Sequence, residues 1–334
     1  MASGSVRQND KALGVPEKLG AEYYREFLTR QGKEVYDRVN AQLLEKDYSG
    51  TSTFLLSDPA AAAADCFAAY RALRDDHPEY FFLGLECRFS RLGSVGTMKY
   101  PILYSEENIG QIQLQLRKYI YQIVRGTAYM DDIEGETTVY ERIAQRMTYE
   151  NNNDMRDHNI CGPVLFGSGV CEGQNALLLL CLRRIRVPCI KVCGRTDTDG
   201  SHCWAVAWIK GEPAHCDVTW EKSAEGNVWF DYLNLSDRQI SANHYSFRSG
   251  RCPECRTGRF SYYQYHGLCV HSPAELYRML RQQAASDMPL RIHFEYRPLT
   301  GSLLNEIKSA FFFTGINAER TVYAHPDNGN VMII

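Results

Sequence analysis

The stretch Gly167-Ser-Gly-Val-Cys171-Glu-Gly-Gln-Asn175 and the apolar run Ala176-Leu-Leu-Leu-Leu-Cys-Leu182 after it decide the fold of this chain. The run is apolar around its whole circumference, which predicts a buried helix of about four turns that ends near Val187-Pro188. Cys171 then lies at the helix N-terminus. Unpaired N–H groups and the positive end of the helix dipole favour a thiolate there, and the thiolate is the nucleophilic form of cysteine.

A β-hairpin is predicted downstream of this helix. Residues 201–209 are apolar and rich in β-forming side chains, Lys210-Gly211 is a turn signal, and residues 214–220 return as a second strand. With a two-residue turn, Trp204 faces Asp217 across the ladder. The hairpin therefore places Asp217 on a known face of the predicted sheet.

The same register brings an imidazole close to this carboxylate. His202 faces Thr219, so Asp217 lies diagonally from His202 on one face and within side-chain reach. A carboxylate that orients one imidazole nitrogen, while the other nitrogen faces a cysteine, is the arrangement of a catalytic triad. We therefore predict Cys171, His202 and Asp217 as catalytic residues.

Three motifs in this order resemble the core of the transglutaminase-like superfamily, a group of papain-like cysteine enzymes. They are Gly-Val-Cys171-Glu-Gly with the following Arg-Val-Pro188, His202-Cys-Trp204, and Asp217-Val-Thr-Trp220. The resemblance covers residues 137–240 and is greatest to the bacterial branch, which acts mainly as cysteine peptidases. It implies an α+β fold with a papain-like core, in which a helix packs on an antiparallel sheet. Gln174-Asn175 departs from the family pattern, where an aromatic or small residue often follows Cys-x-Gly.

The triad and the resemblance together predict cysteine-dependent cleavage or transfer of peptide amide bonds through a thioester acyl-enzyme. Water as the acceptor gives a transglutaminase-like cysteine peptidase, and an amine gives a protein-glutamine γ-glutamyltransferase. A non-catalytic protein-binding scaffold of the same fold is the third alternative. A de-N-glycosylating amidase ranks low, because the tandem zinc-binding cysteine pairs of that group are absent upstream.

Composition and charge narrow the class of protein. The 334 residues are 44% hydrophobic and 23% charged, as in an ordinary globular protein, and the formal net charge is −3. No basic surface is expected for nucleic acid, and no apolar run matches a signal peptide or a membrane span. We expect a cytoplasmic protein with a protein or peptide substrate and no membrane or nucleic-acid partner. The oligomeric state is not predicted.

Four parts follow along the chain. We expect a flexible lead (1–20), a helical N-terminal module (21–130), the catalytic core (131–270) and a small C-terminal β-α-β-β appendix (271–334). Helices are expected at 20–44, 58–73, 109–124, 137–149, 272–285 and 301–313, a short strand or buried connection at 80–83 and 87–89, a strand at 292–296, and a hairpin of 321–324 with 331–334.

The twelve cysteines are expected to be reduced thiols, since the chain has no secretion signal. Those in apolar contexts are expected to be buried and structural: Cys181, Cys189, Cys193, Cys203 and Cys216. Cys252-Pro-Glu-Cys255 has the spacing of a zinc knuckle, which His266 and Cys269 could complete. We expect it to be metal-free, because a second tight pair of typical spacing is absent.

No cofactor or metal is expected elsewhere. An EF-hand loop that began at Asp197 would need an acidic twelfth residue, and that position is Trp208. The histidines His77, His215, His244 and His325 are expected on the surface or as satisfied core residues. The oxyanion of the reaction would be bound by the backbone N–H of Cys171 and by one donor from the preceding segment, for which Tyr149 is a candidate.

Overall fold

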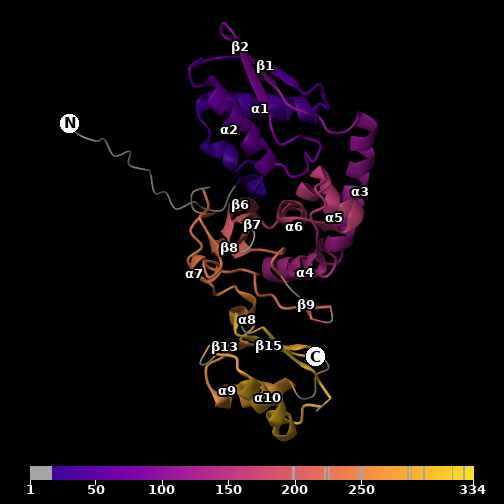
Figure 1. Ribbon diagram of the computed structural model, residues 1–334, viewed down its shortest axis with the longest axis vertical. Helices are drawn as coiled ribbons and strands as arrows, with labels where there is room; N and C mark the ends of the chain where they lie inside the picture. The colour runs from indigo at the N-terminus through magenta and orange to yellow at the C-terminus, as the bar shows by residue number, and fades with distance from the viewer. Residues whose placement is uncertain are drawn as a thin grey trace, which may run out of the picture.

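The computed structural model describes residues 17–197, 200–221, 223–224, 226–247, 251–283, 286, 288–295, 298–317, 319–325 and 328–334. Most of the predicted lead therefore lies outside the described residues. The chain forms three successive bodies along the long axis, with the N-terminal helices at one end and the C-terminal sheet at the other (Figure 1). In the described part, no helix is both long and apolar enough to cross a membrane.

A helix packed on an antiparallel sheet forms the middle body. Helix α6 (Cys171–Arg184) contacts a four-stranded sheet of order β11-β6-β7-β8, in which every pairing is antiparallel. The strands are β6 (Cys189–Thr196), β7 (Gly200–Ile209), β8 (Glu212–Cys216) and β11 (His244–Tyr245). The predicted α+β, papain-like core is confirmed.

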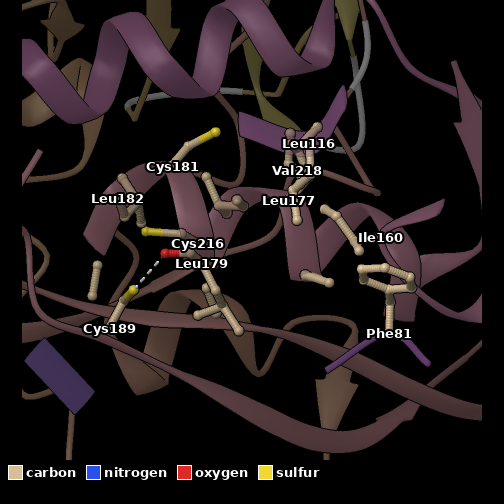
Figure 2. Close-up of a cluster of buried hydrophobic side chains, with 14 of the residues drawn as sticks. Phe81, Leu116, Ile160, Leu177, Leu179, Cys181, Leu182, Cys189, Cys216 and Val218 are labelled. Atoms are coloured by element: carbon tan, nitrogen blue, oxygen red, sulfur yellow. Dashed lines mark hydrogen bonds between the residues drawn. The ribbon is translucent and has the colours of Figure 1, made fainter. Parts of the chain in front are cut away.

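Helix α6 is buried on nearly all sides, as its apolar circumference predicted. Helices α3 (Glu106–Val124), α4 (Asp132–Ala144) and α5 (Cys161–Phe166) pack against the sides that the sheet leaves open. Leu177 lies in the resulting cluster and is fully buried (Figure 2). The thiol of Cys189 donates a hydrogen bond to the Leu179 carbonyl in the same cluster.

The N-terminal module is not purely helical. Besides α1 (Arg30–Leu44) and α2 (Ala62–Asp76), it carries a sheet of order β1-β3-β2, formed by Thr51–Leu55, Val95–Lys99 and Arg88–Leu92. The sequence predicted no strand at β1 or β3, and only a short strand or buried connection at 87–89, which overlaps β2. This strand is mostly exposed and lacks the alternation of a half-buried strand.

Several helix boundaries differ from the sequence expectation. The helix expected at 20–44 is broken, since Thr29 caps α1 by accepting a hydrogen bond from Gly32 N–H, and short 3-10 turns precede it at Glu17–Gly20 and Tyr24–Phe27. Helix α2 begins at Ala62, after the Asp58 carboxylate accepts bonds from two backbone N–H groups. Asp131 caps α4, so this helix starts and ends five residues before the expected bounds.

The segment between α4 and α6 is extended before it turns. Strand β4 (Thr148–Tyr149) pairs in parallel with β5 (Ser168–Gly169), and a 3-10 turn at Met155–His158 lies between them. This pairing fixes the chain immediately before Cys171.

The C-terminal body has its own apolar core. It contains the expected strand, helix and hairpin, as β13 (Leu290–Phe294), α10 (Gly301–Thr314), β14 (Val322–His325) and β15 (Asn330–Ile333), and the expected helix α9 (Pro273–Gln283). A short strand, β12 (Cys269–Val270), joins β13 in parallel and was not expected. Tyr296 and residues 284–285 of the expected elements lie outside the described residues.

Contacts with the core hold this body in place. The Arg291 Nε–H donates to the Val228 carbonyl at 2.7 Å, and Asp231 receives hydrogen bonds from His325 and Asn328 at 2.6 and 2.7 Å. The minor elements β9 (Ser223–Ala224), β10 (Asn227–Val228), α7 (Asp237–Ile240) and α8 (Tyr262–Tyr265) connect the two bodies.

Candidate active site

Two glycines set the position of Cys171 at the first turn of α6. A Cβ atom at Gly173 would come within 2.6 Å of the Asp157 carbonyl oxygen, and one at Gly169 within 3.1 Å of the same oxygen. The Val170 N–H also donates to this carbonyl at 3.1 Å. The close approach of the Asp157 carbonyl therefore requires glycine at both ends of the Gly-Val-Cys-Glu-Gly motif. This packing presents Cys171 at the helix N-terminus.

The hairpin has the register that the sequence predicted. Strands β7 and β8 pair from Ile209 with Glu212 to Ala205 with Cys216, around the turn Lys210-Gly211. The second strand is shorter than expected, because it ends at Cys216 instead of continuing to residue 220. After this point the Asp217 carboxylate accepts the backbone N–H groups of the next turn, which ends the ladder.

Asp217 is buried and accepts four hydrogen bonds. Its Oδ1 atom receives the N–H groups of Thr219 and Trp220 at 2.9 and 3.3 Å, and its Oδ2 atom lies 2.6 Å from His202 Nε2. The fourth bond comes from His244 Nε2 at 2.9 Å. Burial alone would raise the pKa of this carboxyl, but the bonds from the two histidines outweigh burial and hold the pKa well below its usual range.

The Cys171 thiol interacts electrostatically with both His202 and Cys203. The neighbouring Cys203 thiol, together with the charge of His202, lowers the pKa of Cys171 to about 5. Burial opposes a charge on His202, yet the hydrogen bond to Asp217 and the interaction with Cys171 raise its pKa to about 10. Between these values the pair exists as a thiolate and an imidazolium. The structure therefore brings the three predicted residues together.

His244 is the residue that sequence reasoning missed. Its side chain is fully buried, as a core histidine would be, but it bonds to the same Asp217 oxygen as His202. The imidazole packs between Trp204 and Trp220, with ring centroids 4.9 and 4.7 Å away. No local pattern signals this role, because β11 reaches the site by pairing with the outer edge of β6.

The structure shows which of the expected structural cysteines are buried and where Tyr149 lies. All twelve cysteines are free, and four of the five expected structural thiols are buried, whereas Cys193 is exposed. Cys203 is buried but interacts electrostatically with the Cys171 thiol, so its position is more than a packing site. Tyr149 is half-exposed on β4 and pairs with Gly169 of β5, two residues before Cys171. Its part in binding an oxyanion stays a prediction.

The knuckle cysteines have partners other than those expected. Cys255 lies within 4.8 Å of His215 and Asp237, measured between possible metal-ligand atoms, and this group contains neither His266 nor Cys269. The Trp204 Nε1–H donates to His215 Nδ1 at 2.9 Å, so the Nε2 atom of a neutral His215 carries the proton and faces Asp237 at 3.0 Å. In that tautomer His215 offers no lone pair to a metal at Nε2, and the group does not fit a metal ion.

Comparison with known proteins shows which segment of the chain matches a protein family. Residues 118–232 match the family model of the transglutaminase-like superfamily. No curated protein matches the chain. Two solved structures are similar to part of it: a transglutaminase (TM-score 0.31, 11% identity, covering 46% of this chain and 50% of that one) and a protein from Cytophaga hutchinsonii assigned as a candidate cysteine protease (TM-score 0.28, 13% identity, covering 41% and 62%).

The chain thus spans about half the length of the first structure and less than two thirds of the second. The matched segment contains α6 and the β7–β8 hairpin, and with them Cys171, His202 and Asp217. Residues 118–232 form a domain of the transglutaminase-like superfamily.

Proposed function

We propose that the protein cleaves or transfers peptide amide bonds through a thioester on Cys171, and that it acts chiefly as a cysteine peptidase. The observation that carries the proposal is one line of interacting groups: the Cys171 thiol interacts electrostatically with His202, whose Nε2 atom lies 2.6 Å from the buried Asp217 carboxylate. A thiolate beside an imidazolium, fixed by a third group, is the apparatus of thiol acyl transfer.

In this proposal the Cys171 thiolate attacks the carbonyl carbon of the scissile amide. The C–N bond then breaks, and the imidazolium of His202 gives its proton to the leaving amine. In the second half-reaction neutral His202 takes a proton from the incoming water or amine, and the C–S bond breaks to release the acyl group. Asp217 holds the imidazole in orientation through both steps.

The oxyanion that forms on the carbonyl needs donors beside the sulfur. The backbone N–H of Cys171 is one of the unpaired groups of the first turn of α6, where the helix dipole also favours negative charge. The same features that lower the pKa of the thiol therefore favour the tetrahedral intermediate.

The test is mass spectrometry of a proteome digest incubated with the protein. Hydrolysis predicts new peptide termini, whereas transamidation predicts isopeptide links or deamidated glutamine, and both must disappear in the Cys171→Ala variant. A Cys193→Ser variant is the matched control, because it removes the exposed thiol of β6 and leaves the three proposed residues in place. If the wild-type protein produces none of these products, the non-catalytic scaffold is the better account.

A further inference from the structure

A cavity of about 50 Å³ lies between α6 and the N-terminal module, on the side of the helix next to Cys171. The module contributes Asp75, His77 and Phe81 to its wall, and α6 contributes Glu172 and Asn175. Since about 10–15 Å³ of such volume holds one water, the cavity accommodates a group of about three to five non-hydrogen atoms.

Two buried side chains line this cavity with unpaired polar atoms. Asn175 is 2% exposed, and neither its Nδ2 nor its Oδ1 atom has a hydrogen-bond partner. His77 is 9% exposed and its Nε2 atom has no partner either, while its Nδ1 atom lies 2.9 Å from Glu79 Oε1. Unsatisfied buried polar atoms are costly, so whatever occupies the cavity, water or a ligand group, must supply polar partners to them.

The charged groups around the cavity neutralise one another. Lys191 Nζ lies 3.0 Å from Asp75 Oδ1 and 2.7 Å from Glu172 Oε1, and Arg74 is the second cation of the wall. Two cations therefore face two anions among these four side chains, while His158, which also lines the cavity, lies 3.7 Å from Glu172, and this carboxylate raises the pKa of the imidazole. When His158 is neutral, the balance favours a neutral polar group over a carboxylate or an ammonium.

The hydrogen-bonding atoms match a primary carboxamide. Asn175 offers one acceptor and an N–H donor, and His77, in the tautomer that donates Nδ1–H to Glu79, offers a second acceptor at Nε2. A carboxamide has the complementary set, since its NH₂ group can donate to both acceptors while its carbonyl accepts from Asn175. Its three non-hydrogen atoms and one methylene also fit the volume.

The cavity is adjacent to the proposed nucleophile. Glu172 follows Cys171 in the chain and pairs with His158 of the preceding segment, which lies within electrostatic range of the Cys171 thiol. A peptide bound across Cys171 can therefore reach the cavity with a neighbouring side chain.

We propose that this cavity is a substrate subsite that binds the side-chain carboxamide of a glutamine or asparagine residue next to the scissile bond. This proposal rests on the proposed function, because a bond is scissile only if the protein cleaves it. Binding to the cavity can nevertheless be measured without turnover. It assigns to the N-terminal module a part in substrate selection, through His77 and the residues around it.

The experiment measures both turnover and binding. Wild-type protein is given matched peptides that carry glutamine, glutamate or methionine at each position around the cleaved bond. At one position kcat/KM for glutamine should exceed the values for glutamate and methionine by at least about tenfold. Asn175→Leu should bring the glutamine and methionine peptides within about twofold of each other. Asn175→Asp keeps the shape of the side chain and serves as the second variant if Asn175→Leu does not fold.

Binding is measured separately in the Cys171→Ser protein by saturation-transfer NMR, with N-acetyl-glutamine methylamide and N-acetyl-methionine methylamide as probes. We expect a signal from the glutamine probe that Asn175→Leu or Asn175→Asp removes. Equal signals for both probes, or a glutamine signal that survives both variants, would overturn the subsite. Loss of turnover with an intact Asn175-dependent signal would instead contradict the proposed function and leave the subsite standing.

Discussion

His244 Nε2 lies 2.9 Å from the Asp217 Oδ2 atom that His202 Nε2 also contacts at 2.6 Å. One carboxylate oxygen therefore holds two imidazoles, and His202 is the one that interacts electrostatically with the Cys171 thiol. His244 is in turn fixed by the side chain of Asn243, which contacts Nδ1 at 2.6 Å. This arrangement makes His244 a positioning residue, which would act on the reaction through Asp217.

Replacing His244 by Phe should lower kcat about 10- to 100-fold, which corresponds to the loss of a hydrogen bond of ~1.5–3 kcal/mol to a charged group. It should also shift the alkaline limb of the pH profile to higher pH, since Asp217 without this donor concentrates more charge on His202 and raises its pKa. His244→Gln retains an N–H near the Nε2 position and should restore most of the rate. A merely structural role would reduce the active fraction without moving the limb.

The pH dependence of alkylation follows from the pKa values of the Cys171–His202 pair. Iodoacetamide should modify Cys171 with a midpoint near pH 5, because the pKa of this thiol is lowered to about 5, whereas an ordinary thiol titrates near ~8.5. The rate should stay high above this midpoint. Turnover, unlike alkylation, should fall as pH rises through about 10, where His202 loses the proton that the leaving amine requires.

Peptide mapping after a low dose at pH 6.5 identifies the reactive thiol. Cys193 is the internal control, since the surrounding protein raises the pKa of its thiol to about 11 and the thiol is therefore protonated at that pH. His202→Ala should move the Cys171 midpoint upward, and Asp217→Asn should affect turnover far more than alkylation. Uniform labelling of several cysteines would contradict the assignment of the pair.

Substitution of Cys203 provides a separate test of the pKa of the Cys171 thiol. The neighbouring Cys203 thiol helps to lower the pKa of Cys171, so Cys203→Ala should raise the alkylation midpoint by about one pH unit or more. Cys203→Ser keeps an O–H donor and should produce a smaller shift. If the alanine and serine variants have the same midpoint as the wild type, the contact does not tune the nucleophile.

The stability of the core depends on α6. Leu177→Ala should lower the free energy of unfolding by about 2–5 kcal/mol, because Leu177 is fully buried among helices α3 to α6 and the cavity cannot close completely. Urea unfolding measures the change. Leu44→Ala is the matched control, since Leu44 is 70% exposed and its truncation should change stability by less than ~0.5 kcal/mol.

The elements that carry Cys171, His202 and Asp217 could be predicted because their sequence signals are local. A two-residue turn and strand parity fix which residues share a face, so Asp217 could be placed beside His202 before the fold was known. The apolar run after Cys171 likewise allowed few alternatives to a buried helix. These arguments needed no knowledge of distant segments.

The remaining features depend on contacts between segments far apart in sequence. His244 joins the site through pairing of β11 with the far end of β6, and the cavity at Asn175 exists only because the N-terminal module closes over α6. In the β1–β3–β2 sheet, β2 was predicted only in part because it is mostly exposed. The periodicity of apolar residues indicates which face of a helix or strand is buried, but it does not identify the segment that covers this face.

The central claim is that Cys171 carries the acyl group of the reaction. Wild-type protein is mixed with a peptidyl ester that has a good leaving group, quenched in acid within seconds and examined by intact-mass and peptide-mapping mass spectrometry. We predict an added mass equal to the acyl group, located on Cys171, released by hydroxylamine and absent from Cys171→Ala, with slower release in His202→Ala. An acyl group on another residue, or equal ester turnover by the Cys171→Ala variant, would contradict the account.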